Sequence, residues 1–382
     1  MSQALTSTLA MASYALLDDQ PSSNSVMIGF PDHASAERAL AAILANRQAP
    51  LEPPEPRYDA ASAAELLAAL KAARGGEALR LAPGTYSAVL IKGLRFSGPV
   101  RIEGERAILT GLDVRDSEGL AFTGLTFAAS AGGLPNPFIV MRSKGVRFSQ
   151  IDVKGPDDAA PLSGVGGLTL RESAEVSVSG SVFHGLQHGL SILDCTGVLV
   201  AGNRFHHLQT DGVRGGGVSG LAVTANRFSD FFPAQGDHPD AVQLWTTNTM
   251  ASAQGIIIAD NVIVRGEGAA VQGVFLRDQV KTLPYRDVSI ARNLILGGLY
   301  NGLMIEGGDG VVIEGNVVAG FPDQKSWVRM ERVTNLTMTG NQAQQYLLES
   351  KALKEPPVGN EIIASVSDGG AALLAAHNSS GV

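Results

Sequence analysis

The sequence contains a single cysteine, Cys195, and few charged residues. One thiol excludes both a disulfide framework and a cysteine-rich metal site. Charged residues make up only 17% of the chain, too few for a disordered acidic or basic protein. Lysine and arginine total 29 against 37 aspartates and glutamates, so the net charge is −8. This acidic balance argues against a nucleic-acid partner.

The sequence also lacks the features that direct a chain to a membrane. No apolar run reaches the roughly 18 residues that a membrane-spanning helix requires. No lysine or arginine precedes Arg38, whereas a secretory signal begins with a basic region. We therefore expect no membrane partner and no recognisable signal peptide.

The chain divides into three predicted regions. Residues 1–57 form an N-terminal extension, with an amphipathic helix expected over 35–47 and a stiff proline-rich linker after it. Residues 58–350 form the main domain. It opens with a helix over 62–74, because Ser62 and Glu65 have the spacing of a capping box. Residues 351–382 are expected to cap the last part of this domain or to contact another subunit.

Glycine is abundant, with 45 copies, and from about residue 100 the sequence repeats itself. Ten short segments alternate apolar and polar residues, which is the pattern of a strand with one buried face. They begin 20 to 35 residues apart, at Val100, Leu120, Val146, Val176, Val198, Leu221, Ile256, Val288, Val311 and Leu336. Stacked repeats of this kind predict an all-β solenoid, a right-handed parallel β-helix capped by the helix over 62–74.

Six asparagines share one register in these segments. They are Asn203, Asn226, Asn261, Asn293, Asn316 and Asn341. Asparagine tolerates a left-handed turn, and its amide can bond to the amides above and below it in a stack. We therefore predict that these residues form a structural ladder along one corner of the solenoid.

The capped helix, the LAPGTY strand that follows it and the asparagine-cornered coils resemble the pectate-lyase-like superfamily of β-helix proteins over roughly residues 58–350. Membership implies a polysaccharide partner and an extracellular, periplasmic or virion-associated location. The superfamily includes polysaccharide lyases, glycoside hydrolases, uronan epimerases and phage tailspikes, so the fold does not choose the reaction.

A second set of polar residues also shares one register. It is formed by His188, Asp211, Asp240, Gln272, Asn301 and Ser326. Two residues further on, all six coils carry an apolar residue, so we expect that position to face the core and the polar residue to face outward. Stacked Asp211 and Asp240 would place like charges about 5 Å apart, which a purely structural ladder avoids.

The chain is enriched in reactive side chains around this ladder. An enlarged turn brings Asp237 and His238 beside Asp240, and the next insertion carries Arg277, Lys281 and Tyr285. Long turns on a solenoid map to its binding face. The predicted catalytic residues are Asp211, Asp240, His238, Asp237 and Arg277. The predicted substrate-binding residues are His188, Arg214, Gln243, Trp245, Gln272, Lys281, Tyr285 and Asn301.

The favoured reaction is β-elimination on an anionic, uronic-acid-containing polysaccharide. It requires a group that neutralises the uronate carboxylate and a base that removes the C5 proton. Arg214, Arg277 or Gln243, or a Ca²⁺ ion held by Asp211 and Asp240, could neutralise the carboxylate. His238, Lys281 or Tyr285 could act as the base.

Three alternatives remain at this point. A glycoside hydrolase would use Asp211 with Asp240, or Asp237 with Asp211, as its carboxylate pair. A C5-epimerase is suggested because residues 237–240, Asp-His-Pro-Asp, are similar to the Asp-Pro-His-Asp signature of mannuronan C5-epimerases with the middle pair exchanged. The third alternative is a non-catalytic glycan-binding β-helix. A tailspike-type protein, with either chemistry, would be a homotrimer.

Overall fold

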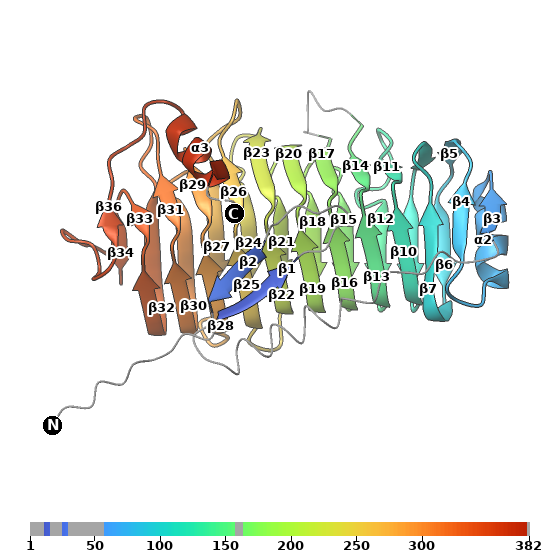
Figure 1. Cartoon of the computed structure of the whole chain (residues 1–382), viewed down its shortest axis with the longest axis horizontal. Helices are drawn as coiled ribbons and strands as arrows, with labels where there is room; N and C mark the ends of the chain where they lie inside the picture. The colour runs from blue at the N-terminus through green and yellow to red at the C-terminus, as the bar shows by residue number, and fades with distance from the viewer. Residues whose placement is uncertain (1–10, 16–24, 30–56, 157–162, 380–382) are drawn as a thin grey trace.

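The computed structural model describes residues 11–15, 25–29, 57–156 and 163–379. The helix expected over 35–47 and the proline-rich linker lie outside the described residues. The main body is an elongated stack of coils whose strands run side by side along its length (Figure 1). Each complete coil contributes three strands, so the stack has three parallel sheet faces. The predicted parallel β-helix is confirmed.

The first face begins each coil, and the residues of the predicted polar ladder lie at or just before the start of its strands. Its strands are β6 (Val89–Lys92), β9 (Leu112–Arg115), β12 (Phe138–Met141), β15 (Leu168–Arg171), β18 (Leu190–Leu193), β21 (Val213–Gly216), β24 (Asp240–Trp245), β27 (Gln272–Arg277), the first parts of β30 (Asn301–Glu314) and β32 (Trp327–Thr339), and β34 (Tyr346–Leu348). The short β35 (Lys351–Ala352) pairs antiparallel with β34.

The second face follows the first in each coil. Its strands are β3 (Arg57–Ala60), β4 (Ala78–Leu81), β7 (Arg95–Glu103), β10 (Glu118–Thr123), β13 (Lys144–Ser149), β16 (Ala174–Ser179), β19 (Thr196–Ala201), β22 (Ser219–Thr224), β25 (Gln254–Ala259), β28 (Tyr285–Ala291) and the second parts of β30 and β32.

The third face closes each coil. Its strands are β5 (Gly84–Tyr86), β8 (Ala107–Leu109), β11 (Thr126–Ala128), β14 (Asp152–Lys154), β17 (Val182–Leu186), β20 (Arg204–Leu208), β23 (Arg227–Phe231), β26 (Val262–Val264), β29 (Leu294–Leu296), β31 (Val317–Ala319), β33 (Gln342–Ala343) and β36 (Glu361–Ile362). Separately, β1 (Met11–Ala15) and β2 (Ser25–Gly29) pair antiparallel.

The core fills the interior of the stack. Phe183, Phe205 and Phe228 stack face to face from coil to coil, with ring centroids 4.8 and 4.9 Å apart. The six apolar residues predicted to point inward are all fully buried: Leu190, Val213, Val242, Val274, Leu303 and Val328. Continuous burial along the axis is what makes each coil depend on its neighbours.

The asparagine ladder forms between the second and third faces as predicted. The amide nitrogen of Asn203 donates to Oδ1 of Asn226 at 2.9 Å, and the same bond repeats at every step to Asn341. The ladder continues one step further, from Asn341 to Asn360 at 2.7 Å. These side chains are buried, so each bond satisfies a polar group that water cannot reach.

One detail of the predicted ladder is wrong. The left-handed residue is the one immediately before each asparagine, and the asparagines themselves have ordinary backbone angles. Gly202, Gly315 and Gly340 occupy this position in three coils, whereas Ala225 (φ 54°), Asp260 (φ 59°) and Arg292 (φ 53°) occupy it in the other three. The bend therefore falls one residue early, which turns the asparagine side chain into the stack.

The helix predicted over 62–74 is α2 (Ala63–Ala72). The Ser62 hydroxyl accepts the backbone N–H of Glu65 at 3.2 Å, and the Glu65 carboxylate accepts that of Ala61 at 2.8 Å. Leu66 and Leu70 are fully buried in the main core. The helix thus covers the N-terminal end of the stack (Figure 1).

The C-terminal region differs from the expected cap over the last coil. The coil register extends past residue 350, because Asn360 joins the ladder and β36 pairs with β33. The final helix, α3 (Ala371–Ser379), packs Leu373 and Leu374 against outward-facing residues of β29 and β31. It therefore lies along the third face and not over the open end (Figure 1). Among the described residues, no helix is long and apolar enough to cross a membrane.

Candidate functional site

The polar ladder forms at the corner between the third and first faces. Val213 pairs with Val242, and Asp240 pairs directly with Gln272, so the ladder residues of successive coils share one register. Ser326 is displaced from this register by an irregularity that pairs Asn301 with Trp327. The aligned ladder therefore runs from His188 to Asn301.

Small residues after the ladder position explain how the chain turns this corner. A Cβ atom on Gly212 would lie 2.5 Å from the ring of Phe228, inside the core. The corresponding residue of the next coil, Ala241, is fully buried in that core. Since this residue and the apolar residue after it both face inward, the ladder side chain before them faces out of the core.

The ladder side chains are nevertheless buried. Asp211 is 3% exposed and Asp240 has no exposed surface, and His188, Gln272 and Asn301 are also buried. Two buried carboxylates on neighbouring coils are costly unless hydrogen bonds or protons compensate them.

Hydrogen bonds connect the Asp211 carboxylate to the backbone of Asp240 and to one cation, Arg214. The backbone N–H of Asp240 donates to Oδ1 of Asp211 at 3.2 Å, and Nη1 of Arg214 donates to Oδ2 of Asp211 at 3.3 Å. Burial, with the nearby charge of Asp240, raises the pKa of Asp211 to about 7, although Arg214 acts in the opposite direction. Burial also raises the pKa of Asp240.

His238 is the reactive side chain that remains accessible. Its Nδ1 lies 2.9 Å from Oδ2 of Asp240, while its side chain is 54% exposed. The hydrogen bond to Asp240 raises the pKa of His238. The amide of Gln243 donates to the same Asp240 oxygen, and Phe275 packs edge-on against the imidazole with centroids 5.1 Å apart.

A chain of amides fixes the proton on this imidazole. The indole N–H of Trp327 can only donate, and it donates to Oδ1 of Asn301 at 3.1 Å. The Asn301 amide must then donate to Oε1 of Gln272, at 2.6 Å, so the Gln272 amide nitrogen faces Nε2 of His238. Nε2 is therefore an acceptor in this arrangement, and the ring is neutral with its proton on Nδ1, toward Asp240.

A groove of about 330 Å³ lies beside the acidic pair on the first face. Its lining is Pro135, Asn136, Ile139, Met141, Gly164, Thr169, Arg171, Gln187, His188, Ser191, Leu193 and Arg214. Among the described residues, the lining contains two arginines and no aspartate or glutamate. Burial, with the charge of Arg214, lowers the pKa of His188 to about 3, so this ring is neutral in the groove wall.

Two predicted site residues have mainly local roles in the structure. The Asp237 carboxylate accepts the amide of Gln209 at 2.8 Å and the backbone N–H of Ala234 at 2.7 Å. It thus braces the turn that carries His238. Trp245 is half-buried at the end of β24, with its ring centroid 5.8 Å from Cζ of Arg214.

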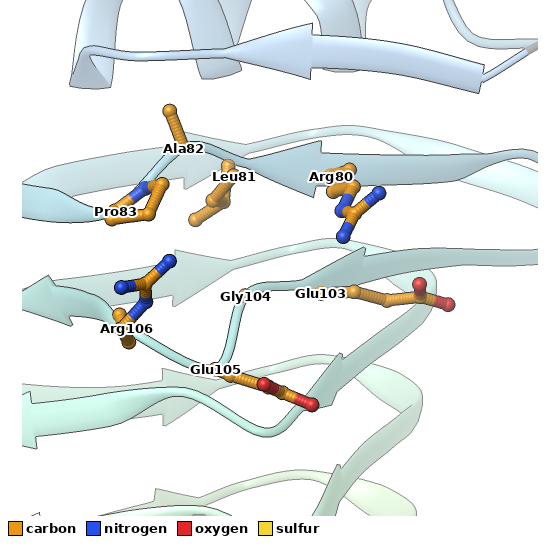
Figure 2. Close-up of a pocket in the computed structure, with 8 residues that line it drawn as sticks. All are labelled: Arg80, Leu81, Ala82, Pro83, Glu103, Gly104, Glu105 and Arg106. Atoms are coloured by element: carbon orange, nitrogen blue, oxygen red, sulfur yellow. The ribbon is translucent and has the colours of Figure 1, made fainter.

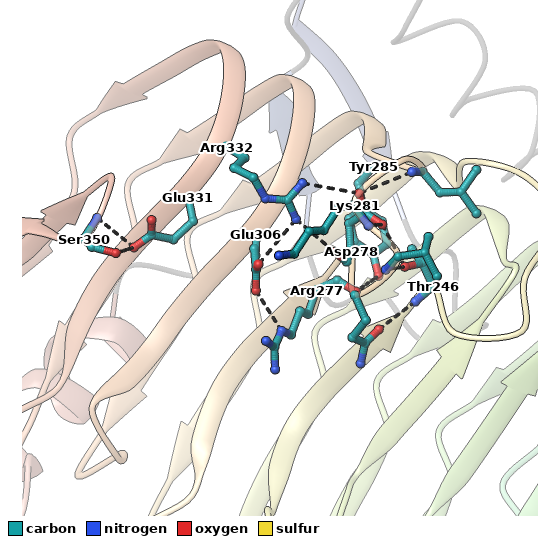
Figure 3. Close-up of polar contacts among 12 residues, drawn as sticks. Thr246, Arg277, Asp278, Lys281, Tyr285, Glu306, Glu331, Arg332 and Ser350 are labelled. Atoms are coloured by element: carbon teal, nitrogen blue, oxygen red, sulfur yellow. Dashed lines mark hydrogen bonds and ion pairs between the residues drawn. The ribbon is translucent and has the colours of Figure 1, made fainter.

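Arg277, Lys281 and Tyr285 belong to a separate network at the other end of the first-face strands (Figure 3). Arg277 is five residues along β27 from Gln272, about 17 Å at strand spacing. Its Nε donates to Glu306 at 2.7 Å. Tyr285 is buried, and its hydroxyl donates to the backbone carbonyl of Arg277 at 3.2 Å.

The buried Asp278 organises that network. Its carboxylate accepts the Thr246 hydroxyl at 2.9 Å and the backbone N–H of Lys281 at 3.0 Å, and Arg332 lies 3.6 Å away. These contacts hold the insertion that follows β27. The structure therefore does not bring Arg277, a predicted neutraliser of the uronate carboxylate, or the predicted bases, Lys281 and Tyr285, to the Asp211–Asp240 pair.

The acidic pair does not fit the predicted Ca²⁺ ion. Ca²⁺ takes six to eight oxygen ligands. Both oxygens of Asp211 and one oxygen of Asp240 already accept hydrogen bonds, some of them from Arg214 and His238. In the described part of the chain, no group of three or more histidine, cysteine, aspartate or glutamate side chains could hold a metal ion.

A larger hollow of about 570 Å³ lies near the N-terminal end of the stack (Figure 2). Arg80, Glu103, Glu105 and Arg106 place charges of both signs around it. None of these four side chains is buried, and Glu103 is paired with Arg101 at 2.7 Å. It therefore lacks the buried, interacting ionisable groups found around Asp240.

Sequence reasoning missed Trp327, Tyr300 and Phe275 at the site. Trp327 was hidden because the alignment placed Ser326 in the ladder register. A register shift between Asn301 and Leu303 of β30 brings Trp327 into contact with Asn301. Tyr300 immediately precedes Asn301. The sequence would have indicated it only to a search for aromatic residues next to the ladder positions. Phe275 is visible in the sequence as an aromatic residue in the register of Gln243.

Comparisons with known proteins support the fold. No protein-family model and no curated protein sequence matches the chain. Two structures of the surface adhesin PfbA of Streptococcus pneumoniae are each 12% identical to this chain. One has a TM-score of 0.54 and covers 76% of this chain and 87% of its own, and the other has a TM-score of 0.50, with 72% and 79%.

An alginate lyase from a Paenibacillus strain is also similar, at a TM-score of 0.40 and 13% identity over 81% of this chain and 99% of its own. The two PfbA structures, at TM-scores of 0.50 and 0.54, show a shared fold and nothing finer. The reaction must therefore be argued from the site.

Proposed function

We propose that this protein is a polysaccharide lyase that cleaves an anionic, uronic-acid-containing polysaccharide by β-elimination. The observation that carries the proposal is the accessible imidazole of His238, anchored through Nδ1 to the fully buried carboxylate of Asp240. A histidine oriented by a buried carboxylate is suited to move a proton at Nε2, because the carboxylate stabilises the imidazolium that forms.

In this mechanism His238 removes the proton from C5 of the uronate. The electron pair of the C5–H bond forms the double bond between C4 and C5, and the bond from C4 to the leaving oxygen breaks. The leaving oxygen then takes a proton from solvent. The amide of Gln272, which donates to Nε2 in the unbound protein, must release that atom when the sugar enters.

Arg214 is the proposed neutraliser of the uronate carboxylate. Its side chain is one-third exposed at the groove, and its strand neighbour in register is Gln243, whose amide lies within 3.4 Å of Nδ1 of His238. A positive group next to the base lowers the energy of the carbanion-like transition state. The groove lining carries Arg171 as well as Arg214 and, among the described residues, no acidic residue, which favours an anionic chain.

The hydrolase alternative is less well supported by the same geometry. Glycoside hydrolysis requires two carboxyl groups that flank and touch the sugar. Asp240 has no exposed surface and is covered by His238 and Gln243, so it cannot contact the substrate directly. The role that its contacts support is to position His238.

The decisive experiment incubates the full-length protein with a panel of uronic-acid polysaccharides and follows the ultraviolet absorbance of an unsaturated uronate. Rising absorbance that is lost in His238→Ala is the expected result. New reducing ends without absorbance would identify a hydrolase and overturn the proposal. Conversion of the sugar without chain cleavage would identify a C5-epimerase, and binding without any conversion would identify a glycan-binding protein.

A further inference from the structure

Tyr300 and Trp327 form an aromatic pair on the surface near the proposed active site. Their rings stack with centroids 5.6 Å apart and planes 26° apart. Tyr300 is 47% exposed. Apart from the His238 imidazole, the only other aromatic ring exposed to a comparable degree among the side chains that the structure describes is Phe232, at 36%.

A chain of hydrogen bonds connects this aromatic pair to His238. The indole N–H of Trp327 bonds to Asn301, Asn301 bonds to Gln272, and Gln272 contacts the imidazole of His238. The four residues come from β32, β30, β27 and the turn before β24. Trp327 therefore lies about three coil spacings, or about 14 Å, along the stack from His238, and Tyr300, just before β30, lies about two coil spacings, or about 10 Å, away.

The chemistry of the pair suits a sugar ring. The indole N–H of Trp327 is already used by Asn301, so Trp327 supports the second ring from behind and leaves the Tyr300 ring available. Aromatic side chains combine a large apolar face with a polar tip, and the C–H face of a pyranose can lie on such a ring while its hydroxyls stay in water.

We propose that the Tyr300 ring, backed by Trp327, is a subsite that binds one pyranose unit of the polysaccharide chain a few sugars from the cleavage point. This inference rests on the proposed function. The groove beside Arg214 holds the chain on one side of His238, and the Tyr300 subsite holds it on the other. The protein then grips a long chain on both sides of the bond that breaks.

The test measures oligosaccharide binding in the full chain carrying His238→Ala, which prevents turnover. Short and long size-defined oligogalacturonates and oligoalginates are titrated by calorimetry into this protein and into its Tyr300→Ala derivative. We expect Tyr300→Ala to weaken binding of the long oligomers about tenfold, while binding of disaccharides is unchanged. Tyr300→Phe, which keeps the ring, should bind like the parent.

Phe232→Ala serves as the matched control, because it removes an exposed ring that packs on His207 instead. Long-oligomer binding that is unaffected by Tyr300→Ala, or equally affected by Phe232→Ala, would overturn the subsite alone. Failure of the parent to bind any oligomer, together with a wild-type protein that produces no unsaturated uronate, would overturn the proposed function and the subsite with it. Thermal unfolding of each variant shows whether a loss of binding reflects loss of fold.

Discussion

Nδ1 of His238 lies 2.9 Å from Oδ2 of Asp240, and this contact joins an accessible ring to a carboxylate that has no exposed surface. The two residues are separated by one proline, Pro239, which is itself buried. The turn therefore delivers the imidazole to the surface while Asp240 stays in the corner of the coil. The proposed chemistry depends on this arrangement, and so do the first two predictions.

Removing either member of this pair should abolish most of the activity. His238→Ala removes the proposed base, and a positioned general base typically contributes about 10²- to 10⁴-fold to the rate. Asp240→Asn keeps the shape but removes the charge that stabilises the imidazolium, so kcat should fall substantially and KM should change little. Initial rates of unsaturated-uronate formation measure both effects. Asp309→Asn, a half-buried carboxylate on the second face, away from the ladder, is the control. Full activity in His238→Ala would eliminate it as the base.

The activity should rise with pH. His238 must be neutral to accept the C5 proton, and Asp240 raises its pKa above the ordinary value of 6.5. The value of kcat/KM should therefore increase as the pH passes through this raised pKa and then level off. In Asp240→Asn the rising limb should move to lower pH, because the group that favours the imidazolium is gone. A limb that stays in place in this variant would assign the titration to another group.

Asp211 should make folding stability depend on pH. Its pKa is 3.8 in an ordinary setting and about 7 in the folded protein, so the folded state holds a proton that the unfolded state has lost between these values. The contribution of Asp211 to the free energy of unfolding is fully present below pH 3.8 and is lost as the pH rises through about 7. At about 1.4 kcal/mol per pKa unit, the loss is about 4 kcal/mol. Denaturant unfolding of wild type and Asp211→Asn across this range measures it. In Asp211→Asn, the part of the pH dependence of the free energy of unfolding that is due to Asp211 should vanish. An identical pH dependence in both proteins would contradict the raised pKa of Asp211.

Chelation should leave the activity intact. Both oxygens of Asp211 and Oδ2 of Asp240 already accept hydrogen bonds from Arg214, His238 and backbone and amide donors, so we expect Arg214 to neutralise the substrate. Rates measured before and after dialysis against a chelator should agree. If chelation abolished the activity and added Ca²⁺ restored it, a metal ion would take part in the reaction. We expect Arg214→Gln to reduce the activity strongly, whereas a metal-dependent enzyme would show only a small effect.

One stabilising substitution follows from the asparagine corner. Ala225 holds a left-handed conformation, φ 54°, at the position where other coils carry glycine. A left-handed residue with a Cβ costs roughly 1–2 kcal/mol, so Ala225→Gly should raise the free energy of unfolding by about 1 kcal/mol. Ala222→Gly, a buried position on the adjacent strand β22, should instead lower it. Equal losses in both variants would show that the left-handed bend is not strained.

The fold and both ladders could be predicted from the sequence because they are periodic. An alternation of period two fixes the buried face of each strand, and a recurring Asn203-type residue fixes the register between coils. The same apolar–polar pattern recurs in every coil. A wrong assignment of one segment is therefore corrected by the pattern of the others. The buried residues at Val213 and Val242 and the amide bonds from Asn203 to Asn341 follow directly from this repetition.

The composition of the site was decided by parts of the chain that do not repeat. The contact between Trp327 and Asn301 depends on a one-residue irregularity in β30, between Asn301 and Leu303. The separation of Arg277 from Gln272 depends on which end of β27 each occupies. The sequence also could not show that Asp240 is covered while His238 is exposed, because both lie in one short polar turn. Burial, and with it the pKa of each carboxyl, is set by what packs over a side chain from other coils. By itself the sequence determined the repeating backbone. Only the tertiary structure decided which charged groups lose contact with water, since that depends on neighbours distant in the chain.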